Sequence, residues 1–234
     1  MQLFYNKDLS PNDKEIQFSK EESRHIVKVL RKSAGDKLHI TNGKGWLFLS
    51  EITLGGEKKC VAKIISSKLE PKRGFSLHLA VAPTKMNERY EWFLEKATEI
   101  GVDSITPIIC QNSERKVIKA DRYEKVLQSA MKQSLTTYLP VLNSAISFKE
   151  FITQDFEGER YIAHCEPTNK ISLKQSATPN KPITILIGPE GDFSTNEIEK
   201  ALYHHFNPVT LGETRLRTET AAIVACHSIV LINE

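Results

Sequence analysis

The sequence predicts two domains: a small β-barrel with one helix over residues 1–70, and an α/β domain over residues 71–234. Two patterns predict this division. The first seventy residues alternate short apolar runs with turn signals such as Asn-Gly and Gly-Gly, which is typical of β-hairpins. From Phe75 onward, strand-like apolar runs alternate with helical patterns, which is typical of a mostly parallel sheet.

Three apolar runs predict the strands of the first domain. They are LHI (38–40), WLFLSEI (46–52) and CVAKII (60–65). Before them, residues 19–36 predict one short helix whose apolar side includes Ile26 and Val29. A proline and a glycine interrupt residues 66–74, so this stretch is predicted to link the two domains.

The second domain is predicted to contain five strands separated by helices. The strands are residues 75–83, 104–110, 161–166, 183–188 and 208–212. The helical period predicts a helix over residues 87–100, which Gly101 would end, and another over residues 121–135. Ser194 and Glu197 have the spacing of a capping box and predict the start of a third helix.

The last predicted helix runs from Glu219 to about Ile232 and is apolar on nearly every side. Such a helix must be buried on several faces. Two arrangements satisfy this requirement: a homodimer interface and a fully enclosed core helix.

Composition limits the class of protein. The chain is 40% hydrophobic and 26% charged, with no apolar run near the eighteen residues of a membrane helix. The first fifteen residues lack the apolar stretch of a signal peptide, so we expect a cytoplasmic protein without membrane attachment. The four cysteines are scattered without a CxxC pair, which predicts reduced thiols and neither disulfides nor a metal site.

The positive charge is unevenly distributed. Residues 1–70 hold 13 Lys and Arg against 9 Asp and Glu, whereas residues 71–234 hold 19 against 20. A basic module beside a neutral one suits a polyanion-binding domain attached to a catalytic domain. An ordinary solvated surface explains the same counts equally well.

Two glycine-bearing segments, ILIGPEGDFS (185–194) and LGETRLRTETA (211–221), carry the clearest functional signal. Each follows an apolar run and precedes a helical pattern, which is where open α/β sheets bind their ligands. Neither segment matches the phosphate-binding GxxxxGK[ST] or dinucleotide GxGxxG pattern. We therefore expect a nucleotide-like ligand held without a phosphate contact. The chain also lacks GxSxG and HExxH, so hydrolase and metalloprotease functions have no support.

Together these segments resemble the cofactor loops of the SPOUT methyltransferases, specifically the RsmE family of ribosomal RNA uridine-N3 methyltransferases. The similarity covers nearly the whole chain and includes residues 24–36, 96–102 and 113–115. It implies an N-terminal PUA-like β-barrel and a C-terminal domain with a trefoil knot. It also implies S-adenosylmethionine as cofactor, 16S ribosomal RNA or the small ribosomal subunit as substrate, and a homodimer.

The resemblance assigns cofactor binding to three loops at strand ends. Their residues are His164, Cys165, Glu166, Leu186, Ile187, Gly188, Pro189, Glu190, Gly191, Leu211, Gly212, Leu216, Arg217, Thr218, Thr220 and Ala221. Uridine N3 reacts only after it loses its proton, so Arg217 is expected to hold the developing charge on a uracil oxygen. Glu190 is a candidate base, or alternatively organises its turn. Arg217 could instead form a structural ion pair with Glu219 or Glu190.

RNA binding is assigned to five basic residues. They are Arg24, Arg31, Lys32, Lys85 and Arg115. Three departures from the family pattern matter: the first two lie beside the cofactor loops, and the third could remove an RNA contact. Asp192 stands where glycine is common, Thr214-Arg215 displaces a basic residue by one place, and Thr136 replaces a common arginine.

Two other functions remain compatible with the sequence. The chain could be a non-catalytic dimeric RNA-binding protein, or a SPOUT methyltransferase that acts on a different RNA nucleotide.

Overall fold

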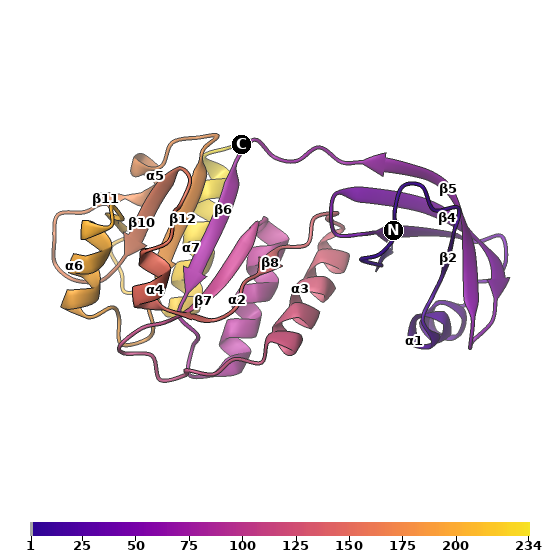
Figure 1. The fold of residues 1–234 in the computed structure, drawn as a ribbon, viewed down its shortest axis with the longest axis horizontal. Coiled ribbons are helices and arrows are strands. Elements are labelled where there is room, and N and C mark those ends of the chain that lie inside the picture. Colours follow the sequence, from indigo (N-terminus) through magenta and orange to yellow (C-terminus); the bar gives the residue numbers. More distant parts are fainter. Residues whose placement is uncertain (1) are drawn as a thin grey trace. The chain divides into compact units, whose positions relative to one another are not determined.

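The computed structural model describes residues 2–234 and divides into two compact units (Figure 1). The first unit extends to Lys72 and includes a second segment, Met131–Leu139. The second unit contains Arg73–Ala130 and Pro140–Glu234. Each unit has its own hydrophobic core.

The first unit is built on a five-stranded, mostly antiparallel sheet in the order β1-β3-β4-β5-β2. Its strands are β1 (Leu3–Tyr5), β2 (Glu15–Gln17), β3 (Lys37–Thr41), β4 (Trp46–Gly55) and β5 (Cys60–Leu69). The three predicted strands are therefore confirmed. Strand β5 runs four residues further than predicted and takes up the start of the predicted linker. The two missed strands are only three residues long, too short to show an alternating pattern.

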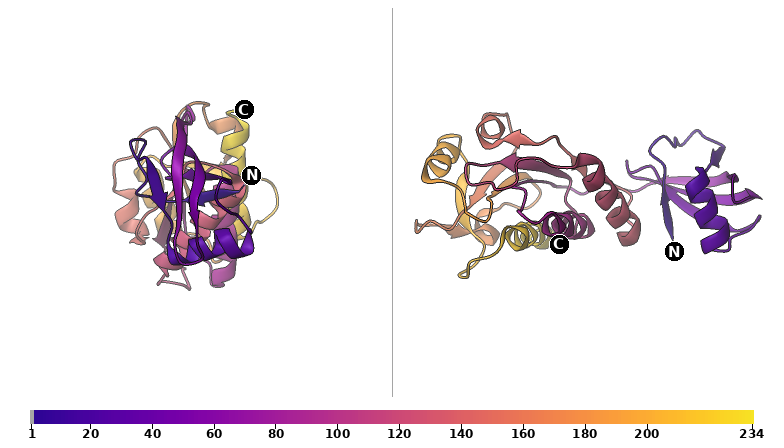
Figure 2. Two further views of the ribbon diagram at one scale, coloured as in Figure 1. Left: turned by 90° about the vertical axis from the view of Figure 1, so that its right-hand side faces the viewer. Right: turned by 90° about the horizontal axis from the view of Figure 1, so that it is seen from below.

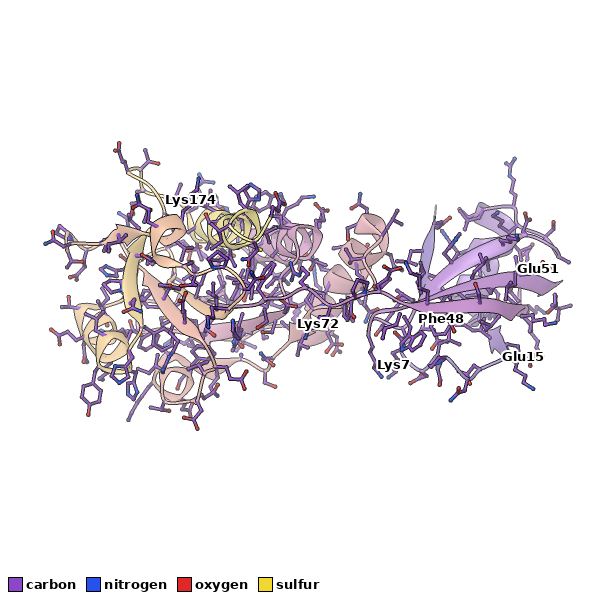
Figure 3. All side chains as sticks on the ribbon, turned by 90° about the horizontal axis from the view of Figure 1, so that it is seen from above. Lys7, Glu15, Phe48, Glu51, Lys72 and Lys174 are labelled. Atoms are coloured by element: carbon purple, nitrogen blue, oxygen red, sulfur yellow. The ribbon has the colours of Figure 1, made fainter. Side chains whose placement is uncertain are left out.

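The predicted helix of this unit is shorter and less regular than expected. It consists of α1 (Lys20–Arg24) followed by one π-helical turn, η1 (His25–Val29). Ile26 is fully buried, whereas Val29 is 64% exposed, so the expected apolar side is wrong at Val29. Phe48 of β4 is fully buried in the core of this unit, and Figure 3 marks its position.

Met131–Leu139 belongs to the first unit because hydrogen bonds tie it to the hairpin between β3 and β4. The Leu139 amide donates to the Gly43 carbonyl (2.9 Å), and the Gly45 amide donates to the Thr137 carbonyl (2.9 Å). The Tyr138 hydroxyl donates to the Glu70 carbonyl (2.8 Å). The sequence groups this segment with the second domain, because long-range backbone pairing leaves no periodic pattern.

The second unit contains a fully parallel sheet in the order β11-β13-β10-β12-β6-β7-β8, with β9 also pairing with β7. The strands are β6 (Ser76–Val81), β7 (Ser104–Ile109), β8 (Val141–Leu142), β9 (Ile146–Ser147), β10 (Glu159–Ala163), β11 (Ile171–Ser172), β12 (Pro182–Ile187) and β13 (Asn207–Thr210). All five predicted strands are present, and the three unpredicted ones have two residues each.

Helices cover both faces of this sheet. They are α2 (Asn87–Ile100), α3 (Ala120–Ser134), α4 (Phe148–Ile152), α5 (Leu173–Ser176), α6 (Thr195–Tyr203) and α7 (Thr218–Leu231). Helices α2 and α7 lie side by side on one face, and α4 and α6 cover the other (Figure 2). The predicted caps are confirmed: Gly101 ends α2 with φ +116°, and Ser194 with Glu197 forms the capping box of α6.

Helix α7 is only partly enclosed. Its buried side, which includes Ala222 and Ile229, packs against α2 and the sheet. Ile223 and Val224 are half-buried, and Leu231 is 44% exposed. The fully enclosed core helix is therefore not what the chain forms by itself.

Candidate active site

Three loops meet at one edge of the parallel sheet. Strands β13, β10 and β12 are neighbours in this order, so the loops that follow their carboxyl ends lie next to one another. Between the loops lie two adjoining cavities of about 500 and 260 Å³. Ala163, Cys165, Arg215, Leu216 and Ala221 line both, so the two cavities form one cleft. This is the position at which open α/β sheets bind ligands.

Hydrogen bonds between the loops fix the shape of the cleft. The Cys165 amide donates to Asp192 Oδ2 (2.7 Å), joining the loop after β10 to the loop after β12. Thr218 Oγ1 donates to the Gly188 carbonyl (3.0 Å), joining the start of α7 to the loop after β12. Lys170 Nζ donates to the His164 carbonyl (2.6 Å), which closes the first loop on itself. The cleft is therefore preorganised before any ligand enters.

The two loop glycines serve different purposes. A Cβ at Gly188 would lie 3.1 Å from two ring carbons of Phe193, so a side chain here would press against this ring. Gly212 has open space around it but adopts φ +142°, a conformation that only glycine takes easily. Gly188 is therefore constrained by packing and Gly212 by backbone conformation.

The larger cavity collects seven of the predicted cofactor residues. They are His164, Cys165, Glu166, Leu211, Gly212, Leu216 and Ala221. Sequence reasoning missed nine further lining residues. They are Ala163, Pro167, Thr168, Lys170, Val209, Thr210, Glu213, Thr214 and Arg215. Most flank the predicted positions, and only Thr214 and Arg215 had been noted as departures from the family pattern.

His164 is the most unusual side chain of the larger cavity. It is 7% exposed, and neither ring nitrogen has a hydrogen-bond partner in the part of the chain that the structure describes. Burial lowers the pKa of the imidazole, Lys170 lowers it further, and Asp192 and Glu166 oppose the shift. The ring is therefore neutral near pH 7 and presents one donor and one acceptor.

The smaller cavity is lined by nine predicted residues, three of which, Cys165, Leu216 and Ala221, also line the larger. The other six are Ile187, Gly188, Pro189, Glu190, Arg217 and Thr218. Asp192 and Arg215 also line it, together with Ala163. This cavity therefore concentrates charge, with two carboxylates and two guanidinium groups around its wall.

The two predicted catalytic residues both line the smaller cavity and not the larger. Glu190 Oε1 accepts a hydrogen bond from the Lys85 amide (2.9 Å), while Glu190 Oε2 is buried without a partner among the described residues. Arg217 is exposed and precedes the first turn of α7. Among residues 2–234 no ion pair joins it to Glu190 or Glu219, and Glu219 instead lies 3.7 Å from Arg89 Nε. The guanidinium of Arg217 is therefore available to a ligand.

Three predicted cofactor residues do not line either cavity: Leu186, Gly191 and Thr220. Leu186 is fully buried in the core with α4 and α6, because adjacent strand residues face opposite sides of a sheet. The Gly191 carbonyl accepts a hydrogen bond from Asn112 Nδ2 (3.2 Å), which supports the loop from behind.

The predicted RNA-binding residues fall into two groups. Arg24, Arg31 and Lys32 belong to the first unit, where both arginines are exposed and Lys32 lies 3.6 Å from Asp36. Lys85 and Arg115 belong to the second unit. Lys85 Nζ pairs with Glu114 (2.8 Å).

Arg115 has a structural role. Its Nε and Nη2 donate to the Thr84 and Lys85 carbonyls (3.1 and 2.8 Å). Because the Lys85 amide in turn binds Glu190, Arg115 supports the wall of the smaller cavity. No motif in the sequence indicates that Arg115 supports the cavity wall.

Within residues 2–234, no group of three or more His, Cys, Asp or Glu side chains is arranged to hold a metal ion. In the same part of the chain, no helix is both long enough and apolar enough to span a membrane.

Comparison with known proteins follows the contiguous division that the sequence predicts, with Met131–Leu139 inside the second match. Residues 71–230 match an RNA methyltransferase domain family, and residues 18–65 match an RNA methyltransferase PUA domain family. A ribosomal RNA small subunit methyltransferase E of Rickettsia conorii is 30% identical over 98% of this chain and 95% of its own length.

Two solved structures extend this similarity to three dimensions. A probable rRNA-methyltransferase from Porphyromonas gingivalis has a TM-score of 0.92 and 40% identity, covering 100% of this chain and 98% of its own. A ribosomal RNA small subunit methyltransferase E from Neisseria gonorrhoeae, bound to S-adenosyl methionine, has a TM-score of 0.86 and 26% identity, with the same coverage. The predicted fold class, an α/β methyltransferase domain with a PUA-like domain, is confirmed, while the trefoil knot and the homodimer stay predictions.

Proposed function

The chain belongs to the ribosomal RNA small subunit methyltransferase E family of RNA methyltransferases, and we propose that it transfers a methyl group from S-adenosylmethionine to N3 of a uridine in 16S ribosomal RNA. The observation that carries the proposal is the cleft at the ends of β10, β12 and β13, where Arg217 and Glu190 line one part and His164 the other. The solved relative that holds S-adenosyl methionine supports the choice of cofactor.

The residues of the cleft fit this cofactor. His164 is buried with two unpartnered ring nitrogens, and a purine or a ribose offers the complementary donors and acceptors. Leu211 and Leu216 supply apolar wall for a flat ring, and no lysine-rich phosphate loop is present in the two glycine segments. We assign the adenosine to the larger cavity because these groups all line it.

When bound, S-adenosylmethionine supplies an electrophilic methyl group on a cationic sulfur. We assign the target base to the smaller cavity, which Glu190 and Arg217 both line. Glu190 Oε1 is held by the Lys85 amide, which leaves the unpartnered Oε2 to accept the N3 proton of uridine. Arg217, without an ion-pair partner among the described residues, stabilises negative charge on a uracil carbonyl oxygen.

The first unit is proposed to hold the RNA through Arg24, Arg31 and Lys32, because two of them are exposed and the unit matches a PUA domain family. Helix α7 leaves Ile223, Val224 and Leu231 incompletely covered, which supports a homodimer through this helix. We place the protein in the cytoplasm, where small ribosomal subunits assemble.

The test is methyl transfer from isotopically labelled S-adenosylmethionine to unmodified 16S ribosomal RNA and to intact small subunits, followed by nucleoside analysis. We expect one 3-methyluridine per RNA. A different methylated nucleoside would overturn the uridine-N3 assignment but not the reaction class. Binding of RNA without any transfer would support a non-catalytic protein.

A further inference from the structure

Asp192 occupies an unusual backbone conformation at the edge of the smaller cavity. Its φ is +62°, in the left-handed region where glycine is the usual residue and Asp is among the few tolerated others. Its amide donates to the Pro189 carbonyl (2.9 Å), so the residue closes the turn that begins at Pro189. Where the family commonly has a second glycine, this chain therefore keeps the turn and adds a carboxylate.

That carboxylate is fixed by two backbone amides. Oδ2 accepts from Cys165 (2.7 Å), and Oδ1 accepts from Phe193 (2.8 Å). Asn112 Nδ2 donates to the Asp192 carbonyl (3.1 Å) and holds the backbone from the other side. A carboxylate held at both oxygens keeps its position when a ligand arrives.

The charge of Asp192 is not cancelled by contact with a cation. Arg215 and Arg217 line the same cavity, yet neither forms an ion pair with Asp192 within residues 2–234. Its field reaches the neighbouring loop: burial raises the pKa of the Cys165 thiol, Asp192 raises it further, and Arg215 opposes the shift. Asp192 is therefore a fixed carboxylate on the wall of the smaller cavity, beside Glu190 and the guanidinium groups of Arg215 and Arg217.

We infer that Asp192 is a specificity-determining residue that makes the cleft prefer the cationic methyl donor S-adenosylmethionine over its uncharged product S-adenosylhomocysteine. The inference rests on the proposed function and adds to it. The two ligands differ by one methyl group and one positive charge on sulfur, and the methyl must face the target base in the smaller cavity. A fixed carboxylate on that wall stabilises the charged ligand and has little effect on the neutral one. The preference would limit inhibition by product.

The test is calorimetric titration of both ligands into the full chain and into D192N and D192G. D192N keeps the shape of the side chain and removes its charge. D192G suits the left-handed φ and serves if the asparagine variant does not fold. E199Q, which removes an exposed carboxylate from α6, is the matched control.

We expect D192N to weaken S-adenosylmethionine binding by roughly threefold to tenfold, the scale of one partly screened charge pair. S-adenosylhomocysteine binding should change less than twofold. Added salt should reduce the difference in S-adenosylmethionine affinity between wild type and D192N. An equal loss for both ligands would show that Asp192 only braces the loops and would overturn the inference, as would no change for either. If the wild-type chain bound neither ligand, the proposed cofactor itself would be wrong.

Discussion

The two cavities of the cleft differ in how they are built. The larger has sixteen lining residues, among them the charged side chains of Glu166, Lys170, Glu213 and Arg215 and the buried imidazole of His164. The smaller carries Glu190, Asp192, Arg215 and Arg217 on its wall. Both cavities therefore carry four charged side chains, but in the smaller one backbone amides hold both carboxylates, Glu190 and Asp192. Fixed charges suit a reaction in which charge develops and disappears. We therefore propose cofactor binding for the larger cavity and the chemical step for the smaller.

Three of the four buried polar atoms without a partner among the described residues belong to residues of the cleft. His164, which lines the larger cavity, has two unpartnered ring nitrogens, and Glu190, which lines the smaller, has one unpartnered carboxylate oxygen. The fourth, Glu219 Oε2, belongs to a residue that lines neither cavity. Buried polar atoms without partners are costly, so we propose that the ligands satisfy those of His164 and Glu190. Changes on the two sides of the cleft should therefore alter different measured quantities.

Arg217 provides the largest expected effect. R217A should reduce single-turnover methylation by roughly 10²-fold or more, the scale of removing one preorganised donor, while S-adenosylmethionine affinity changes little. R217K keeps the charge without the planar guanidinium and should fall between alanine and wild type. Raising the pH should partly rescue R217A, because uridine ionises more easily. Loss of cofactor binding in R217A would show that Arg217 shapes the cofactor pocket and does not act in the methyl transfer itself.

Substitutions of the two loop glycines separate the effect of side-chain crowding from that of backbone strain. G188V should weaken S-adenosylmethionine binding by more than about tenfold, because the new side chain displaces Phe193. In G212A the added methyl group meets no atom within 4 Å. The φ of +142° should nevertheless lower the free energy of unfolding by about 1 kcal/mol or more. G35A is the matched control, since Gly35 has φ +92° and open space in the first unit. Calorimetry measures the affinity for S-adenosylmethionine, and thermal melting measures folding. Unchanged cofactor affinity in both G188V and G212A would contradict the pocket assignment.

Changes in the first unit should leave both cavities unaffected. Replacing Arg24, Arg31 and Lys32 together by glutamine should weaken RNA binding by about tenfold. It should also make the slope of the logarithm of the RNA-binding constant against the logarithm of salt concentration shallower by about two to three. Affinity for S-adenosylmethionine should stay the same. The control replaces the exposed Lys149, Lys174 and Lys181 of the second unit (Lys174 in Figure 3). If both triple variants lose RNA equally, the first unit is not the specific RNA-binding surface.

The smallest effect is expected from the protonation of His164. Burial lowers its pKa below the usual value near 6.5, so the ring is neutral and competent to bind above that lowered pKa. Cofactor affinity should therefore be constant at neutral pH and fall severalfold as the pH drops through the lowered pKa. H164N cannot titrate and should show a flat profile. An unchanged acid dependence in H164N would assign the titration to another group.

Much of this fold could be predicted because its long elements repeat a pattern. The run 183–188 and the capping box at Ser194 were sufficient to predict the strand-turn-helix that carries Glu190. The two-residue strands and Met131–Leu139 could not be predicted, since backbone pairing over long sequence distances leaves no local signal. The burial of Val29 was wrongly predicted, because the π-helical turn at His25–Val29 rotates the apolar face away from the position that the α-helical period gives.

The candidate site was predictable to a similar extent. The glycine segments mark two of the three loops, and the resemblance adds the third. The second role of Arg115, as a support for the Thr84 and Lys85 carbonyls, follows from side-chain geometry that no motif encodes. Asp192 was visible in the sequence as a departure, but its bond to the Cys165 amide became evident only when β10 and β12 were placed side by side.

The most direct test of the division between the cavities is a crystal structure of the chain with S-adenosylhomocysteine bound. We expect the adenine to lie in the larger cavity, with a hydrogen bond between His164 and the adenosine, and the sulfur to face Glu190 and Arg217. Adenine in the smaller cavity, or His164 still without a partner in the complex, would contradict this division.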